Sequence, residues 1–166
     1  MKGCKSWLLA VSLCAPLAAQ AAEPESCASV RFADVGWTDI TVTTATTRQV
    51  LESLGYTTKV TMLSVPVTYK SLANKDLDVF LGNWMPSMAN DIKPFADKGQ
   101  VETVGANLEG AKYTLAVPQY VYDGGLRSFA DIAKFSDKLG NKIYGIEPGN
   151  DGNRVAQSMI DKNAFE

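Results

Sequence analysis

The sequence predicts an α/β fold built on a largely parallel sheet, because short apolar runs alternate with loops and helical stretches along the chain. The clearest run, residues 79–81, is typical of a strand that is buried on both faces. Residues 113–118 have the same character. The 166 residues are 46 % hydrophobic and 20 % charged, a composition that supports one domain with a substantial core.

Each element is expected from its local pattern. The first long helix should begin at Thr38 or Asp39 as N-cap and end before Gly55, although its threonine-rich first half has low helix propensity. Ser128 and Asp131 resemble a capping box, with Asp in the acidic position. The expected strands are residues 30–35, 58–65, 77–81, 113–118 and 142–146, and the expected helices are residues 40–54, 67–73, 86–98 with a break at Pro94, 128–139 and 153–162.

The first residues have the pattern of a secretory signal peptide. Lys2 and Lys5 precede a short apolar core at residues 7–17, and a small-x-small site predicts cleavage near Ala21 or Ala22. Cleavage would leave Cys27 as an odd cysteine in an oxidising compartment, where a missing disulfide partner is expected. This is a first indication that the sequence is part of a longer protein.

The composition argues against several function classes. The chain has no histidine, so it lacks the commonest general base and the commonest metal ligand. No serine or cysteine can therefore have a histidine partner on this chain, and we predict no enzyme activity, no cofactor and no metal. A net charge of −2 gives no basis for nucleic-acid binding. The glycine-rich stretch at residues 149–152 lacks the lysine of a P-loop.

Three aromatic residues lie in or beside the loops where a parallel sheet places its ligand groups. Trp37 and Trp84 each follow an expected strand, and Tyr113 begins another. With the nearby Asp39 and with Asn150 in a further loop, they could surround a cation that cannot form hydrogen bonds. Each residue also has a simpler interpretation, in which the aromatic residues belong to the core, Asp39 is an N-cap and Asn150 is a turn residue.

Residues 32–39, 79–86 and 144–150 together resemble the periplasmic choline-binding proteins of ABC importers, within the glycine betaine type of substrate-binding proteins. The resemblance implies two α/β lobes that close on the ligand. It also implies an aromatic box formed by Trp37, Trp84 and Tyr113, with Asp39 and Asn150 holding the choline hydroxyl.

The resemblance further implies that the chain is an incomplete two-lobed periplasmic binding protein of type II-like architecture. The family's box has another tryptophan in the second lobe, and no tryptophan follows Trp84 here. We expect a signal peptide at residues 1–22, lobe one at residues 23–115 and the start of lobe two at residues 116–166.

The predicted function is a periplasmic receptor that captures choline and delivers it to ABC permease subunits, as a monomer when full-length. A receptor for glycine betaine, proline betaine or carnitine is the first alternative. Asp39 separates the two, because a hydroxyl can donate to an ionised carboxylate whereas a betaine carboxylate would be repelled. A secreted enzyme on a similar two-lobed fold and a sensor ectodomain are alternatives of other classes.

Overall fold

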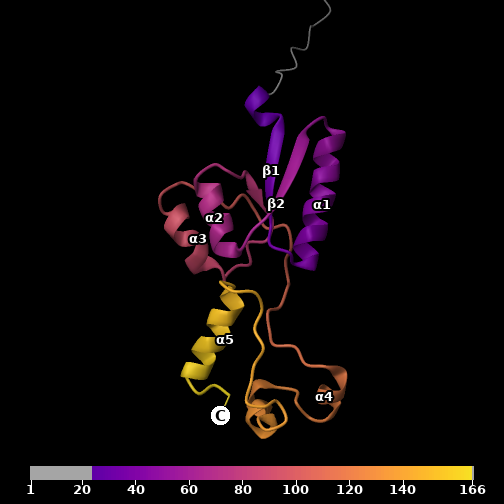
Figure 1. Ribbon diagram of the computed structural model, residues 1–166, viewed down its shortest axis with the longest axis vertical. Coiled ribbons are helices and arrows are strands. Elements are labelled where there is room, and N and C mark those ends of the chain that lie inside the picture. The colour runs from indigo at the N-terminus through magenta and orange to yellow at the C-terminus, as the bar shows by residue number, and fades with distance from the viewer. Residues whose placement is uncertain (1–23, 166) are drawn as a thin grey trace, which may run out of the picture.

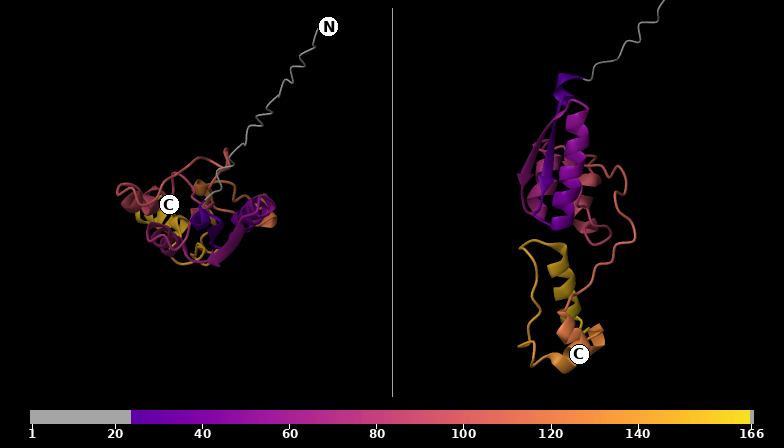
Figure 2. Two further views of the ribbon diagram at one scale, coloured as in Figure 1. Left: turned by 90° about the horizontal axis from the view of Figure 1, so that it is seen from above. Right: turned by 90° about the vertical axis from the view of Figure 1, so that its right-hand side faces the viewer.

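The structure is a computed structural model, and it describes residues 24–165; the predicted signal peptide lies outside the described residues. The chain forms two bodies stacked along the long axis (Figure 1). The N-terminal body, residues 24–101, holds the sheet, and the C-terminal body, residues 118–165, holds α5 (Figures 1 and 2). An extended linker, residues 102–117, joins them. The elements are η1 (Glu25–Cys27), β1 (Ser29–Asp34), α1 (Thr38–Ser53), β2 (Thr57–Met62), α2 (Val65–Ala73), β3 (Val79–Phe80), α3 (Ala89–Ala96), α4 (Gln119–Asp123), η2 (Phe129–Phe135) and α5 (Asp151–Asp161).

The sheet has the order β2-β1-β3, and both pairings are parallel, as the sequence predicts. β1 is central, so Phe32 and Ala33 are fully buried between its neighbours and the covering helices. β3 is shorter than expected and only half-buried, so the predicted strand at residues 77–81 that is buried on both faces is wrong in extent and burial. Within the described residues β3 pairs with β1 alone, so no described strand pairs with its other edge.

Helix α1 begins two residues earlier than the sequence suggests. Trp37 occupies the N-cap position without a side-chain cap, so the prediction of Thr38 or Asp39 as the N-cap is wrong. The threonine-rich half is helical because Ile40 and Thr44 are buried against the N-terminal body. Such packing overrides a low helix propensity. Other threonines donate their hydroxyl protons to carbonyls four residues earlier, which satisfies the hydroxyls locally.

The core of the N-terminal body lies between α2 and α3. Val65 and Tyr69 of α2 pack against Met88 and Ile92, and both Trp37 and Trp84 lie against this cluster. Residues 85–88 form a turn, so the expected helix start at Pro86 is wrong and α3 begins at Ala89. The cluster fixes the position of the chain that leaves β3 and therefore of the residues that follow it.

The C-terminal body contains less regular structure than expected. Residues 113–118 and 142–146 are extended but are not strands, since no described strand lies beside them to share backbone hydrogen bonds. The capping box is confirmed, because the Asp131 carboxylate accepts hydrogen bonds from the Ser128 amide and hydroxyl at 3.1 and 2.7 Å. The helix that it opens is a 3₁₀ helix, η2, rather than an α-helix.

Two further observations concern the described residues. Cys27 is exposed at the end of η1 and forms no disulfide there. No described helix has both the length and the apolar character that a membrane span requires.

Candidate functional site

A cavity of about 640 Å³ opens where the end of β3 faces the linker and α5. Its walls come from the start of α1, from residues 81–87, from residues 107–113 of the linker and from Val155 of α5. The cavity therefore lies outside the carboxyl end of β3, where open parallel sheets place their ligands. Three of the five predicted site residues line it, namely Asp39, Trp84 and Tyr113.

Trp84 and Tyr113 form an aromatic pair on the cavity wall, with ring centroids 5.9 Å apart and planes tilted by 45°. Two hydrogen bonds fix the backbone of Trp84: its amide donates to Met88 Sδ at 3.1 Å, and its carbonyl accepts from Ser87 Oγ at 3.0 Å. Tyr113 comes from the linker, and 51 % of its surface is exposed. The pair brings together residues that lie 29 positions apart in the sequence.

Two carboxylates line the same cavity. Asp39 lies in the first turn of α1 and is exposed, so its side chain is accessible to a ligand. Glu109 of the linker is the second. Glu109 belongs to no motif, and its place on the wall follows from the path of the linker.

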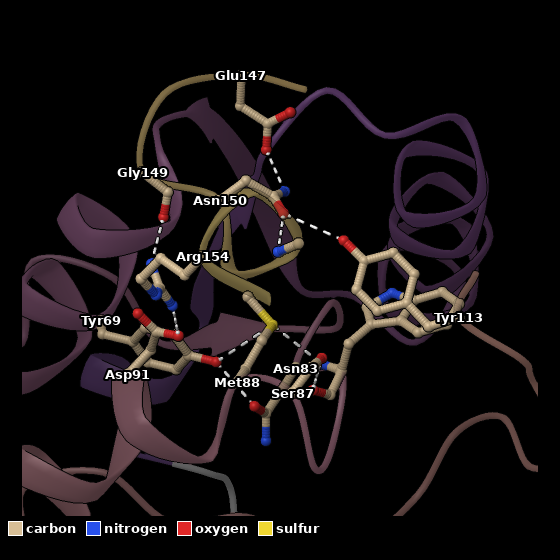
Figure 3. Close-up of polar contacts among 12 residues, drawn as sticks. Tyr69, Asn83, Ser87, Met88, Asp91, Tyr113, Glu147, Gly149, Asn150 and Arg154 are labelled. Atoms are coloured by element: carbon tan, nitrogen blue, oxygen red, sulfur yellow. Dashed lines mark hydrogen bonds and ion pairs between the residues drawn. The ribbon is translucent and has the colours of Figure 1, made fainter. Parts of the chain in front are cut away.

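Asn150 is buried, with 1 % of its surface exposed, and it caps α5. Its Oδ1 accepts from the Gly152 amide at 2.7 Å and from the Tyr113 hydroxyl at 3.2 Å, and its Nδ2 donates to Glu147 Oε1 at 2.7 Å (Figure 3). An asparagine amide offers two acceptor and two donor positions. Three of the four are used, and the one that remains is an N–H.

Trp37 does not line the cavity. Its ring packs on the edge of the N-terminal core, and its Nε1 donates to Glu147 Oε1 at 3.0 Å. The structure thus brings Trp37 to Glu147 and Asn150, while Trp84 and Tyr113 face the cavity. Glu147 is a residue of the site that sequence reasoning missed, because its partner Trp37 lies 110 positions away.

The ionisation of the site follows from these contacts. Burial alone would raise the pKa of Glu147, but hydrogen bonds from Asn150, its own backbone amide and Trp37 outweigh burial and lower the pKa. The pKa of Tyr113 is raised, first by burial and then by the charges of Asp151 and Glu147. Glu147 is therefore an anion at neutral pH, and Tyr113 keeps its proton to donate to Asn150.

The family of substrate-binding domains of ABC-type glycine betaine transport systems matches residues 28–166. The chain belongs to this family. A Chromohalobacter salexigens protein called uncharacterized protein ORF1 is 59 % identical over 140 residues, which cover 84 % of this chain and 88 % of that one. The glycine betaine/carnitine transport binding protein GbuC of Listeria monocytogenes is 28 % identical over 93 residues, 55 % of this chain and 30 % of that one.

Two solved structures are also similar. An ABC-transporter choline-binding protein in complex with choline is 61 % identical with a TM-score of 0.80, over 87 % of this chain and 50 % of that one. An unliganded semi-closed choline-binding protein is 61 % identical with a TM-score of 0.74, over 85 % of this chain and 49 % of that one. The chain therefore spans about half the length of these structures. This confirms the expected fold class, an incomplete two-lobed α/β binding protein. The relatives with an assigned role are transport binding proteins rather than enzymes.

Proposed function

We propose that this chain is part of a periplasmic receptor that captures choline and delivers it to the permease subunits of an ABC transporter. The observation that carries the proposal is that the Trp84–Tyr113 pair and the Asp39 carboxylate line one cavity. The similarity to a solved choline complex supports it. In this proposal residues 1–22 direct export, residues 23–115 form lobe one and residues 116–166 begin lobe two.

The aromatic pair supplies binding energy for a quaternary ammonium group. Such a group has no N–H, so it gains nothing from hydrogen-bond acceptors, but its charge is attracted to the negative faces of aromatic rings. Trp84 and Tyr113 present adjoining rings at the cavity. Trp37 is proposed as a third wall, because its hydrogen bond to Glu147 engages the edge of the ring and not a face.

Asp39 and Asn150 are proposed to hold the choline hydroxyl between them. A hydroxyl both donates and accepts, so it needs a partner of each kind. Asp39 can accept its proton, and the unused N–H of Asn150 can donate to its oxygen. Charge assistance makes the bond to Asp39 the stronger of the two.

Glycine betaine is the alternative ligand that a specific observation favours, since the Listeria relative is a glycine betaine/carnitine binding protein. Betaine carries a carboxylate in place of the hydroxyl. That carboxylate could accept from Asn150, but Asp39 and Glu109 on the cavity wall would repel it. A site with these two acids selects against an anionic ligand group.

Calorimetry with choline and glycine betaine tests the proposal, because the two ligands share the trimethylammonium group and differ at the other end. The protein should be expressed from its complete reading frame. We expect binding of choline and weak or undetectable binding of glycine betaine. Tighter binding of glycine betaine would overturn the assignment, and binding of neither would overturn the whole receptor proposal.

A further inference from the structure

We propose that Glu147 is a positioning residue that ties Trp37 to Asn150 and thereby holds the two bodies together around the ligand. This inference rests on the proposed function, because it assigns a role within the same site. Glu147 itself does not line the cavity. It acts through the two residues that it contacts.

One carboxylate oxygen makes both contacts. Glu147 Oε1 accepts from Trp37 Nε1 at 3.0 Å and from Asn150 Nδ2 at 2.7 Å. A carboxylate oxygen has lone pairs for two donors, and bonds to an ionised acceptor are about twice as strong as neutral ones. Both bonds are partly shielded from water, so bulk solvent screens them less than it screens a surface pair.

The first consequence concerns Asn150. Glu147 can only accept and the Gly152 amide can only donate, so together they allow one orientation of the Asn150 amide group. In that orientation Oδ1 accepts from the Tyr113 hydroxyl (Figure 3). One N–H of the amide is left over. Without Glu147 the Nδ2 end would lose its fixed partner, and the amide would hold the ligand's hydroxyl less well.

The second consequence concerns the relative position of the two bodies. Trp37 precedes α1 in the N-terminal body, whereas Glu147 and Asn150 precede α5 in the C-terminal body. The Trp37–Glu147 bond therefore forms only when the start of α5 lies against the N-terminal body. An ion pair between Arg154 of α5 and Asp91 of α3 joins the same two regions (Figure 3). Loss of the Glu147 bond should allow the bodies to separate more readily.

This arrangement predicts an effect on ligand release. Breaking a shielded, charge-assisted contact raises dissociation rates more than it lowers association rates. We expect Glu147→Ala to release choline about tenfold faster than the wild type, the factor that one hydrogen bond to a charged group represents in a binding constant. Glu147→Gln retains an acceptor oxygen of the same reach, so its release rate should lie between the two.

The experiment combines stopped-flow release of choline with NMR of the ligand-free protein. The indole Hε1 resonance of Trp37 is identified by its loss in Trp37→Phe. We expect this resonance to move upfield in Glu147→Ala, because the indole loses its acceptor. Glu102→Ala, in the exposed part of the linker, is the matched control and should change neither readout.

A double-mutant cycle tests the coupling directly. If Glu147 acts through Trp37, the losses of choline affinity in Glu147→Ala and Trp37→Phe should not add in the double variant. Should Glu147→Ala fail to fold, Glu147→Gln keeps the side-chain volume and is measured in its place.

The outcomes separate the inference from the function on which it rests. A wild type that binds no choline overturns the proposed function. A wild type that binds choline, with a Glu147 variant that releases it at the wild-type rate or leaves the Trp37 resonance unmoved, overturns the inference alone. Fully additive losses in the cycle would also overturn it.

Discussion

Trp84 offers the sharpest test of the site, because its two surfaces have different roles. One side packs against the Val65, Tyr69, Met88 and Ile92 cluster, and the other lines the cavity beside Tyr113. Replacing Trp84 by alanine should therefore lower both the stability of the ligand-free protein and its affinity for choline. The two losses have different physical causes, and a series of substitutions can separate them.

The stability loss should be moderate. Removing a fully buried tryptophan costs about 3–5 kcal/mol, but Trp84 is only half-buried, so we expect roughly half of that for Trp84→Ala. The affinity loss should be larger than burial explains. A desolvated cation–π contact is worth about 2 kcal/mol, so its loss should raise the dissociation constant for choline by roughly 30-fold.

The series Trp84→Phe, Trp84→Leu and Trp84→Ala distinguishes the two causes. Phenylalanine keeps an aromatic face, so it should recover part of the choline affinity. Leucine restores apolar packing without a negative ring face, so it should recover stability but little affinity. Thermal melts of each ligand-free variant beside choline calorimetry provide both readouts. Equal affinity of the leucine and phenylalanine variants would refute the cation–π assignment and leave Trp84 as a packing residue.

The remaining predictions concern the polar part of the site. Asp39→Asn should weaken choline binding by about 1–3 kcal/mol through loss of a charged acceptor. The control Asp137→Asn, on the exposed surface of the C-terminal body, should leave choline binding unchanged. Equal losses of choline affinity in the two variants, measured by calorimetry, would refute this. Tyr113→Phe keeps the ring and loses only the bond to Asn150, so its choline dissociation constant should rise less than that of Tyr113→Leu. The Glu147 contribution to stability should be constant at neutral pH and should be lost only as pH falls below the ordinary value of 4.5, because its pKa is lowered on folding. The difference between acid unfolding of the wild type and of Glu147→Gln measures that contribution, and identical curves would contradict it.

Much of the N-terminal body could be predicted from local patterns. The strand at β1, the helix α1 and the strand β2 follow from runs of apolar and β-branched residues, and their order along the chain predicts parallel pairing. The capping box at Ser128 was equally readable, because its partners lie three residues apart. The position of Trp84 on the wall of the cavity followed from the rule that parallel strands place loops at their carboxyl ends.

The expectations that failed depended on partners distant in the sequence. Residues 113–118 and 142–146 have strand-like composition, but a strand exists only where another backbone lies beside it, and the described chain provides none there. The Pro86 signal for a helix start was likewise overridden by the turn that seats Met88 in the core. Local propensity is a weak prior that tertiary packing often reverses.

The sequence by itself determined which side chains could bind a quaternary ammonium ion: the aromatic residues Trp37, Trp84 and Tyr113, and the polar residues Asp39 and Asn150. Only the tertiary structure decided how they are grouped, with Trp84, Tyr113 and Asp39 on one cavity and Trp37 joined to Asn150 through Glu147. The reason is that residue chemistry is local, whereas a shared acceptor such as Glu147 depends on two helix starts meeting in space. No pattern within a few residues of Glu147 encodes a partner 110 positions away.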